Sequence, residues 1–194
     1  MVSFPESASK DALRKRALAT RNALLPTERA RFSDAICGHL KGMSADWDGP
    51  VSGYLPIRSE ADIHPFLAEL ARAGHTVCLP RVMPDDSLVF LAWQPGEHLT
   101  QAGFGTLAPA DGAAVVTPRV LLAPLAAFDR CGGRIGYGRG YYDRALAALR
   151  QIGAVTAIGI AFSVQECDDI PADAHDQPLN AVVTEAGLRV FAAR

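Results

Sequence analysis

Apolar residues in the first part of the chain follow helical spacing. One pattern starts at a capping serine, Ser7 or Ser9, and runs to about Leu25. A second pattern begins directly after it with a proline and predicts Thr27 as its N-cap. We therefore expect two helices before the first strand.

Short apolar runs further along predict strands that alternate with helices. Continuous runs are typical of parallel strands that are covered on both faces. The stretch 94–118 is rich in Gly, Pro and Ala, and we interpret it as a long connection with one short strand near its end. Strands are expected at 51–55, 76–79 (ended by Pro80), 88–93, 114–116, 120–125, 157–160 and 181–183, and further helices at 60–73 (ended by Gly74) and from Tyr142 to Leu149.

This alternation predicts an α/β fold. We expect a single three-layer domain, residues 1–194, with a central, mostly parallel sheet and right-handed crossovers. A chain of 194 residues is long enough to bury one substantial core.

The nearly balanced charge of the chain narrows the range of expected ligands. A net charge of −2 and a pI near 6.2 argue against a general nucleic-acid binder, which needs a broad basic surface. Positive charge is instead local, at 10–21 and 130–144, and suits a small anionic ligand. No segment is long and apolar enough to span a bilayer, so neither a nucleic acid nor a membrane is an expected partner.

Cysteine usage and the first residues predict a compartment. The four cysteines are scattered without a CxxC pair, so a cysteine metal site is not expected. A disulfide framework is not expected either, because a chain of this size does not need one. Free thiols are typical of the reducing cytosol. Residues 1–7 lack the apolar region of a signal peptide. We therefore expect a cytoplasmic protein.

The segment 128–144 carries a pattern with chemical meaning. It holds five glycines and follows the apolar run 120–125. A strand, a Gly-rich turn and a helix in this order are typical of a phosphate-binding loop, because glycines admit close approach of an anion and the helix opens with free N–H groups. Arg134 and Arg139 would add bidentate contacts to phosphate oxygens, and Asp143 would hold Mg²⁺. The alternative is a basic Gly-rich turn that binds no ligand.

Other catalytic patterns are missing from the sequence. It has neither a Walker A motif nor a G-x-S-x-G elbow, and its histidines lack the spacing of metal ligands. A nucleotide would therefore be bound by a different kind of loop.

The same segment resembles the 5-formyltetrahydrofolate cyclo-ligase family (5,10-methenyltetrahydrofolate synthetases). The resemblance rests on AFD at 127–129 and GRIGYGRGYYD at 133–143, and weaker similarity extends over nearly the whole chain. It implies a single α/β domain with a mostly parallel sheet, in agreement with the pattern of elements.

The resemblance also implies a nucleotide site. The family carries an N-terminal Lys-x-x-x-Arg whose side chains contact ATP phosphates, and Lys10 and Arg14 match its spacing. From the charges alone, these two residues would form a solvated basic face of a helix. A clamp on the phosphates requires that helix to pack at the carboxyl end of the sheet. The residues implied in ATP binding are Lys10, Arg14, Arg134, Gly136, Tyr137, Gly138, Arg139, Gly140, Tyr141, Tyr142 and Asp143.

A second group of residues would bind the folate substrate. Glu60 follows a strand end, where α/β folds bind ligands, and a glutamate at this place in the family accepts hydrogen bonds from the pterin. The resemblance adds Leu55, Tyr142 and, at the next strand end, Arg81. Without the resemblance, Glu60 is a residue of a helix N-terminus, favoured by the helix dipole, and Arg81 is a partner in an exposed salt bridge.

Magnesium is implied by the same resemblance, with Asp143 and the position of Asn180 as ligands. The family has an acid where this chain has Asn180, which offers an oxygen without the charge. A structural cap near the start of a strand is the alternative role for Asn180.

The resemblance thus implies an enzyme: an ATP-dependent cyclo-ligase that converts 5-formyltetrahydrofolate to 5,10-methenyltetrahydrofolate and releases ADP and phosphate. Mg²⁺ would be the cofactor, ATP and a reduced folate the small-molecule partners, and the protein a monomer. Two alternatives stay open. Asn180 favours a non-catalytic folate- or nucleotide-binding protein, and fold alone also permits a phosphosugar-handling protein, against which Glu60 and the paired tyrosines argue.

Overall fold

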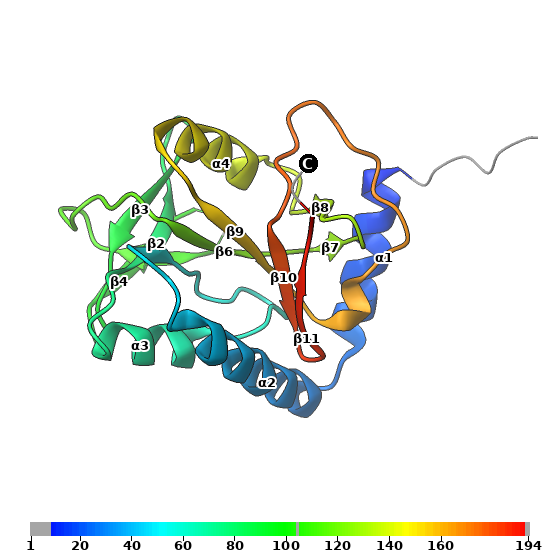
Figure 1. The fold of residues 1–194 in the computed structure, drawn as a ribbon, viewed down its shortest axis with the longest axis horizontal. Coiled ribbons are helices and arrows are strands. Elements are labelled where there is room, and N and C mark those ends of the chain that lie inside the picture. Colours follow the sequence, from blue (N-terminus) through cyan, green and yellow to red (C-terminus); the bar gives the residue numbers. More distant parts are fainter. Residues whose placement is uncertain (1–8, 104, 193–194) are drawn as a thin grey trace, which may run out of the picture.

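The computed structural model describes residues 9–103 and 105–192 and has a central seven-stranded sheet with helices on both faces (Figure 1). The strand order in this sheet is β11-β10-β9-β6-β1-β2-β3. Two smaller sheets, β4-β5 and β7-β8, are hairpins outside it. The predicted three-layer α/β class is confirmed.

Adjacent strands in the middle of the sheet run parallel, and the strand at each edge is antiparallel to its neighbour. The sheet is therefore mostly parallel, as predicted. The parallel strands are β1 (Val51–Ser52), β2 (Val77–Val82), β6 (Val120–Pro124), β9 (Thr156–Ile160) and β10 (Ala181–Thr184), and the edges are β3 (Leu88–Ala92) and β11 (Gly187–Val190).

Helices α2 and α3 cover one face of the sheet, and α4 covers the other (Figure 1). The helix α3 connects β1 to β2 on one side of β1, whereas α4 connects β6 to β9 on the other side. Because both crossovers are right-handed, opposite directions of travel put the two helices on opposite faces. The helices are α1 (Lys10–Ala23), α2 (Pro26–Ser44), α3 (His64–Arg72) and α4 (Tyr141–Ile152).

The side chains of β6 show why both faces are apolar. Val120 and Leu122 belong to the core cluster that contains α2 and α3, whereas Leu121 and Ala123 belong to the cluster that contains α4. Successive side chains of a strand point to opposite faces. A continuous apolar run is thus what a strand between two helical layers requires.

The helix α1 stands outside the three layers (Figure 1). Its residues Leu13 and Ala17 pack against the hairpin of β7 (Ala127–Phe128) and β8 (Arg134–Ile135), which follows the carboxyl end of β6. The short 3₁₀ helix Ser163–Gln165 contacts α1 as well. This is the position that a clamp on a phosphate ligand requires of the first helix.

The helix starts confirm one predicted cap and correct another. Ser9 caps α1, because its hydroxyl accepts a hydrogen bond from the Ala12 N–H at 3.3 Å. The alternative cap Ser7, like the whole segment 1–7, lies outside the described residues. The prediction of Thr27 as the cap of α2 is wrong, since a proline occupies the first helical position, where its fixed φ is already helical.

Two further boundaries differ from the prediction. The helix α3 begins at His64 and not at residue 60, because the chain first makes a turn after β1. The strand β2 continues through Pro80 to Val82, although we expected the proline to end it. The pairing of β2 with β1 already ends at Cys78, so no strand on that side requires a backbone N–H from residue 80.

The segment 94–118 is more ordered than the plain connection that we expected. It contains a hairpin of β4 (Leu99–Gln101) and β5 (Leu107–Pro109). The strand expected at 114–116 is reduced to an isolated bridge at Val115. Strands of three residues are too short for an alternating pattern to be recognised.

All four cysteines are free. Burial raises the pKa of the Cys37, Cys78 and Cys167 thiols, so these side chains stay protonated at neutral pH. In the part of the chain that the structure describes, none of the helices has the length and apolar character needed to cross a bilayer.

The turn between β7 and β8 is organised by the buried carboxylate of Asp129. Its Oδ1 accepts the N–H groups of Cys131 and Gly133, both at 2.8 Å, and its Oδ2 accepts that of Ile170 at 3.2 Å. A Cβ added to Gly133 would lie 2.4 Å from Oδ2. This turn fixes the start of the Gly-rich loop that follows β8.

We expect Asp129→Ala to destabilise the protein by about 3 kcal/mol, because it removes the acceptor of three backbone donors and each unsatisfied buried donor costs about 1–3 kcal/mol. Asp129→Asn keeps one acceptor oxygen and should lose less. Urea unfolding followed by circular dichroism measures both. Equal losses in the two variants, or none in either, contradict this role of the carboxylate.

Candidate active site

A cavity of about 1090 Å³ lies at the carboxyl ends of β1 and β6. The connections after these two adjacent strands lead toward opposite edges of the sheet, and such a switch point is where open α/β sheets bind ligands. The walls come from α1 and from the segments 54–60, 134–144 and 173–177. The predicted residues that line it are Lys10, Arg14, Leu55, Glu60, Arg134, Gly136, Tyr137, Gly138, Arg139, Gly140, Tyr141, Tyr142 and Asp143.

The Gly-rich loop brings its backbone into the cavity at two left-handed glycines. Gly138 and Gly140 have φ angles of 92° and 65°, which residues with a side chain adopt only with strain. Gly140 directly precedes α4, and no side chain of the described residues caps this helix. The N–H groups in the first turn of α4 are therefore available to an anion in the cavity.

Arg14 ties α1 to this loop. Its Nε donates to the carbonyl of Gly136 at 2.8 Å, and its guanidinium also pairs with Asp11. A Cβ on Gly138 would lie 3.5 Å from the same guanidinium. Helix and loop thus form one continuous cationic wall.

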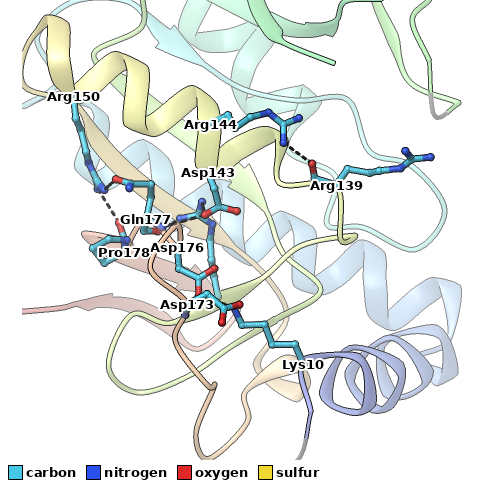
Figure 2. Close-up of polar contacts among 10 residues, drawn as sticks. Lys10, Arg139, Asp143, Arg144, Arg150, Asp173, Asp176, Gln177 and Pro178 are labelled. Carbon is cyan, nitrogen blue, oxygen red and sulfur yellow. Dashed lines mark hydrogen bonds and ion pairs between the residues drawn. The ribbon is translucent and has the colours of Figure 1, made fainter. Parts of the chain in front are cut away.

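Lys10, one helical turn before Arg14, is held by two acids that sequence reasoning missed. Its ammonium lies 2.6 Å from Asp173 and 2.5 Å from Asp176, in the segment before β10 (Figure 2). Burial lowers the pKa of Lys10, but the hydrogen bonds and charges of the two aspartates outweigh it and raise the pKa above its ordinary value. A phosphate that approaches Lys10 must compete with these carboxylates. From the sequence we assigned no role to either aspartate, although acids are dense at 166–176.

Arg134 is buried and bound to Asp143, so it is not free to move to a ligand. Its Nη2 pairs with Asp143 Oδ1 at 2.6 Å, and its Nη1 donates to the Gln177 carbonyl. The N–H of Gln177 donates to the same Oδ1 at 3.1 Å. Burial lowers the pKa of Arg134, and the charge of Asp143 opposes this shift. Both bonds to Asp143 end on Oδ1, which leaves Oδ2 as the oxygen that a ligand can use.

The outer rim of the cavity contains Arg144, which we did not predict. Its Nη1 donates to the Arg139 carbonyl at 2.9 Å (Figure 2), and its Nη2 donates to the Asp86 carbonyl at 2.8 Å. Its guanidinium lies 5.4 Å from the ring centre of Tyr141, whose hydroxyl donates to Asp86 at 3.1 Å. These contacts tie the start of α4 to the turn between β2 and β3.

Another part of the cavity holds a single buried carboxylate among aromatic residues. Glu60 is 8% exposed; its Oε2 accepts the Ile57 N–H at 2.9 Å, and its Oε1 is buried without a hydrogen-bond partner among the described residues. Burial raises the pKa of Glu60, although the Ile57 N–H, the Tyr137 hydroxyl and two arginines oppose the shift. Burial and the charge of Glu60 raise the pKa of Tyr142. The buried, unpartnered Oε1 of Glu60 requires a hydrogen-bond donor from a ligand.

Two predicted residues are not brought to the cavity. Arg81 donates to the Pro109 carbonyl at 3.0 Å and pairs with the exposed Asp111 at 2.8 Å, which corresponds to the salt-bridge alternative. Asn180 stands at the amino end of β10, and its Oδ1 accepts the Ala157 N–H at 2.8 Å. The cavity lies at the opposite ends of the strands, so this geometry favours the structural cap for Asn180.

Comparison with known proteins agrees with the geometry. A model of the 5-formyltetrahydrofolate cyclo-ligase family matches residues 6–185. The 5-formyltetrahydrofolate cyclo-ligase of Escherichia coli K12 is 34% identical over 140 residues, which cover 69% of this chain and 76% of that protein. The cyclo-ligase of Mycolicibacterium smegmatis is 31% identical over 187 residues, 91% of this chain and 93% of that protein. Among solved structures, the 5,10-methenyltetrahydrofolate synthetase of Aquifex aeolicus has a TM-score of 0.80 at 30% identity and covers 95% of this chain and 94% of its own.

If Asp173 competes with a phosphate for Lys10, Asp173→Asn should tighten the binding of inorganic tripolyphosphate. An exposed ion pair contributes about 0.2–1 kcal/mol, so the Kd should fall by up to about fivefold. Isothermal titration calorimetry at constant ionic strength measures it. Asp168→Asn, which removes an exposed charge from the same region, is the control. An equal change in both variants points to general charge repulsion and not to competition for Lys10.

Proposed function

Because the chain belongs to the 5-formyltetrahydrofolate cyclo-ligase family, we propose that the cavity is an active site in which ATP and 5-formyltetrahydrofolate react. The products are 5,10-methenyltetrahydrofolate, ADP and phosphate. One observation carries this assignment of the cavity: a cationic Gly-rich loop and an unpartnered buried carboxylate oxygen, at Glu60, open into the same space.

The helix α1 sets the distance between the two parts of the cavity. Lys10 is the first residue of α1. Arg21 follows eleven residues later and binds Ser59 and Tyr137 at the end of the cavity that contains Glu60. At 1.5 Å per residue this separation is about 16 Å. The cavity therefore has room for a triphosphate at one end of α1 and a pterin at the other.

The phosphate end uses backbone and side chains together. The first-turn N–H groups of α4 and the backbone around Gly138 and Gly140 hold phosphate oxygens, and Lys10 and Arg14 approach from α1. Arg139 extends from the same loop (Figure 2). Arg134 acts through Asp143, which it orients, since its buried guanidinium is bound to Asp143 and to the Gln177 carbonyl.

The folate end recognises a pterin by its donor edge. An ionised Glu60 offers the unpartnered Oε1 to the amino group and ring N–H of the pyrimidine. Leu55 and Tyr142 line the same cavity and supply apolar contact area for the ring. A ligand donor at Oε1 removes the penalty of an unsatisfied buried acceptor, which makes this contact specific.

The chemistry requires activation of the formyl group. The γ-phosphoryl group moves from ATP to the formyl oxygen, and ADP leaves. Nitrogen 10 then attacks the formyl carbon and loses its proton, the carbon–oxygen bond breaks, and phosphate departs with that oxygen. No residue needs to form a covalent bond. The loop and the cations hold the phosphoryl group in line with the formyl oxygen and stabilise the charge that develops.

A magnesium ion fits this cavity if the nucleotide supplies most of the ligands of the ion. Within the described residues there is no cluster of three or more His, Cys, Asp or Glu side chains that could hold a metal. Mg²⁺ in phosphoryl-transfer sites is commonly held by one or two carboxylates and the phosphates themselves, where it neutralises charge. We propose Asp143 as the carboxylate, because its Oδ2 is not used by Arg134 or Gln177.

The structure removes the reason for the alternative of a non-catalytic folate- or nucleotide-binding protein. Its support was Asn180 in place of an acid, and Asn180 does not line the cavity. A monomer that acts in the cytoplasm remains part of our proposal, and the four free cysteines support a reducing compartment.

The reaction is tested by mixing the protein with MgATP and 5-formyltetrahydrofolate and following the near-ultraviolet absorbance that the methenyl product acquires. We expect product only when ATP, Mg²⁺ and the formyl substrate are all present, with one ADP released per product. Samples without ATP, or with EDTA, are the controls. Stoichiometric folate binding without turnover supports the binding-protein alternative.

The role of Asn180 is tested with Asn180→Asp. The Oδ1 of Asn180 accepts the Ala157 N–H, and an aspartate oxygen can do the same. We therefore expect activity to depend on Mg²⁺ concentration in the same way in the variant and in the parent. A carboxylate next to the ion would instead lower the half-saturating Mg²⁺ concentration, because hard cations prefer charged oxygens. A shift of the titration to lower Mg²⁺ concentration would show that residue 180 lies next to the ion and would contradict the role of a structural cap.

A further inference from the structure

Arg21 is the largest polar side chain in the interior, and the activity described so far gives it no role. It is 1% exposed. Its Nε donates to Ser59 Oγ at 3.0 Å, its Nη1 to the Leu125 carbonyl at 3.4 Å and its Nη2 to the Tyr137 hydroxyl at 2.8 Å. These acceptors lie after β1, after β6 and in the Gly-rich loop. One side chain of α1 thus binds all three segments that meet at the folate end.

The charge of Arg21 is not balanced by any of these acceptors, because all three are neutral. A buried charge without a counter-charge is unfavourable by several kcal/mol. Glu60 is the buried carboxylate on this side of the cavity, and its Oε1 has no partner among the described residues. The two buried charges share Tyr137 as a neighbour: Arg21 donates to its hydroxyl, and the same hydroxyl interacts with Glu60.

The remaining groups around Glu60 do not supply an equivalent charge. Tyr54, on the chain after β1, is buried and donates to the Ala61 carbonyl at 2.8 Å. Tyr142 of α4 is a neutral phenol. Arg58 is cationic and also lowers the pKa of Glu60, but its side chain is exposed, with its guanidinium 5.5 Å from the ring centre of Tyr137. Arg21 is therefore the buried cation for Glu60.

We propose that Arg21 is a positioning residue for the folate end of the cavity: it supplies the buried positive charge for the Glu60 carboxylate and holds the Tyr137 hydroxyl in place. A buried positive charge favours the ionised form of a carboxylate. Ionised Glu60 accepts hydrogen bonds, whereas protonated Glu60 would present a donor to the donor edge of a pterin. The folate consequence rests on the proposed function; the link between Arg21 and Glu60 does not.

The direction of the effect follows from the charges. Burial already raises the pKa of Glu60, and Arg21 opposes this shift. Loss of the cation should raise the pKa of Glu60 further, by about one unit for a close opposite charge. As the pH falls, the variant should therefore protonate Glu60 earlier than the parent does.

The link is measured without any ligand. Protein labelled with ¹³C at the glutamate carboxyl carbons is titrated by NMR, and the Glu60 signal is identified by its absence in Glu60→Gln. In Arg21→Gln we expect the titration midpoint to move up by about one pH unit. The control is Arg58→Gln, which removes a cation from the same tyrosine ring but an exposed one, and should move the midpoint by less than about half a unit. An unchanged midpoint in Arg21→Gln, or equal shifts in both variants, overturns the proposal.

A second measurement applies where Arg21→Gln folds but is too unstable for the pH titration. If the two buried charges balance each other, the double variant Arg21→Gln/Glu60→Gln should have a higher Tm than Arg21→Gln alone, because it buries neither charge. A double variant no more stable than Arg21→Gln alone overturns the coupling.

The folate readout separates this inference from the proposed function. In Arg21→Gln, the KM for 5-formyltetrahydrofolate should begin to rise about one pH unit higher than in the parent, while the KM for ATP changes by less than about twofold. In Glu60→Gln the KM for folate should be high at every pH. If Glu60→Gln leaves that KM unchanged while the NMR midpoint shifts as expected, the pterin assignment is wrong and the role of Arg21 stands.

Discussion

The parallel pairing of β1 with β6 is the constraint on which the site depends. Val51 lies opposite Val120 in this ladder, and both are buried. Because α3 carries the chain away on one side and α4 on the other, no crossover covers the carboxyl ends of these two strands. The segments that leave them, with Glu60 after β1 and the Gly-rich loop after β6, must face each other across the gap. Neither segment forms the cavity alone.

The helix α1 closes this gap from outside the layers. The side of this helix that packs Leu13 and Ala17 against the β7–β8 hairpin also places the cationic side chains of Lys10 and Arg14 at the cavity. Arg14 and Arg21 contact the consecutive residues Gly136 and Tyr137. The helix therefore couples the proposed nucleotide side to the proposed folate side through a rigid element, as sites that depend on accurate placement require.

The sequence predicted strands, and a Gly-rich loop that lines the cavity, where local pattern decides them. Continuous apolar runs mark β6, β9 and β10, and the motif at 133–143 marks the loop. Features that depend on long-range partners were missed. Asp173 and Asp176 are ordinary acids until the fold brings them to Lys10. The position of Asn180 is decided by the parallel register of β10 with β9, which no local pattern reveals.

The hydrogen bonds of Lys10 to Asp173 and Asp176 span 163 and 166 residues of sequence. During synthesis the chain grows at about 5–20 residues per second, so α1 leaves the ribosome roughly 8–33 seconds before these partners do. The nascent chain can pair β1 with β2 and later with β6, but the proposed phosphate end of the cavity lacks one wall until the segment 173–177 has emerged. A helix that is made before every strand of the sheet is thus among the last elements to reach its final surroundings.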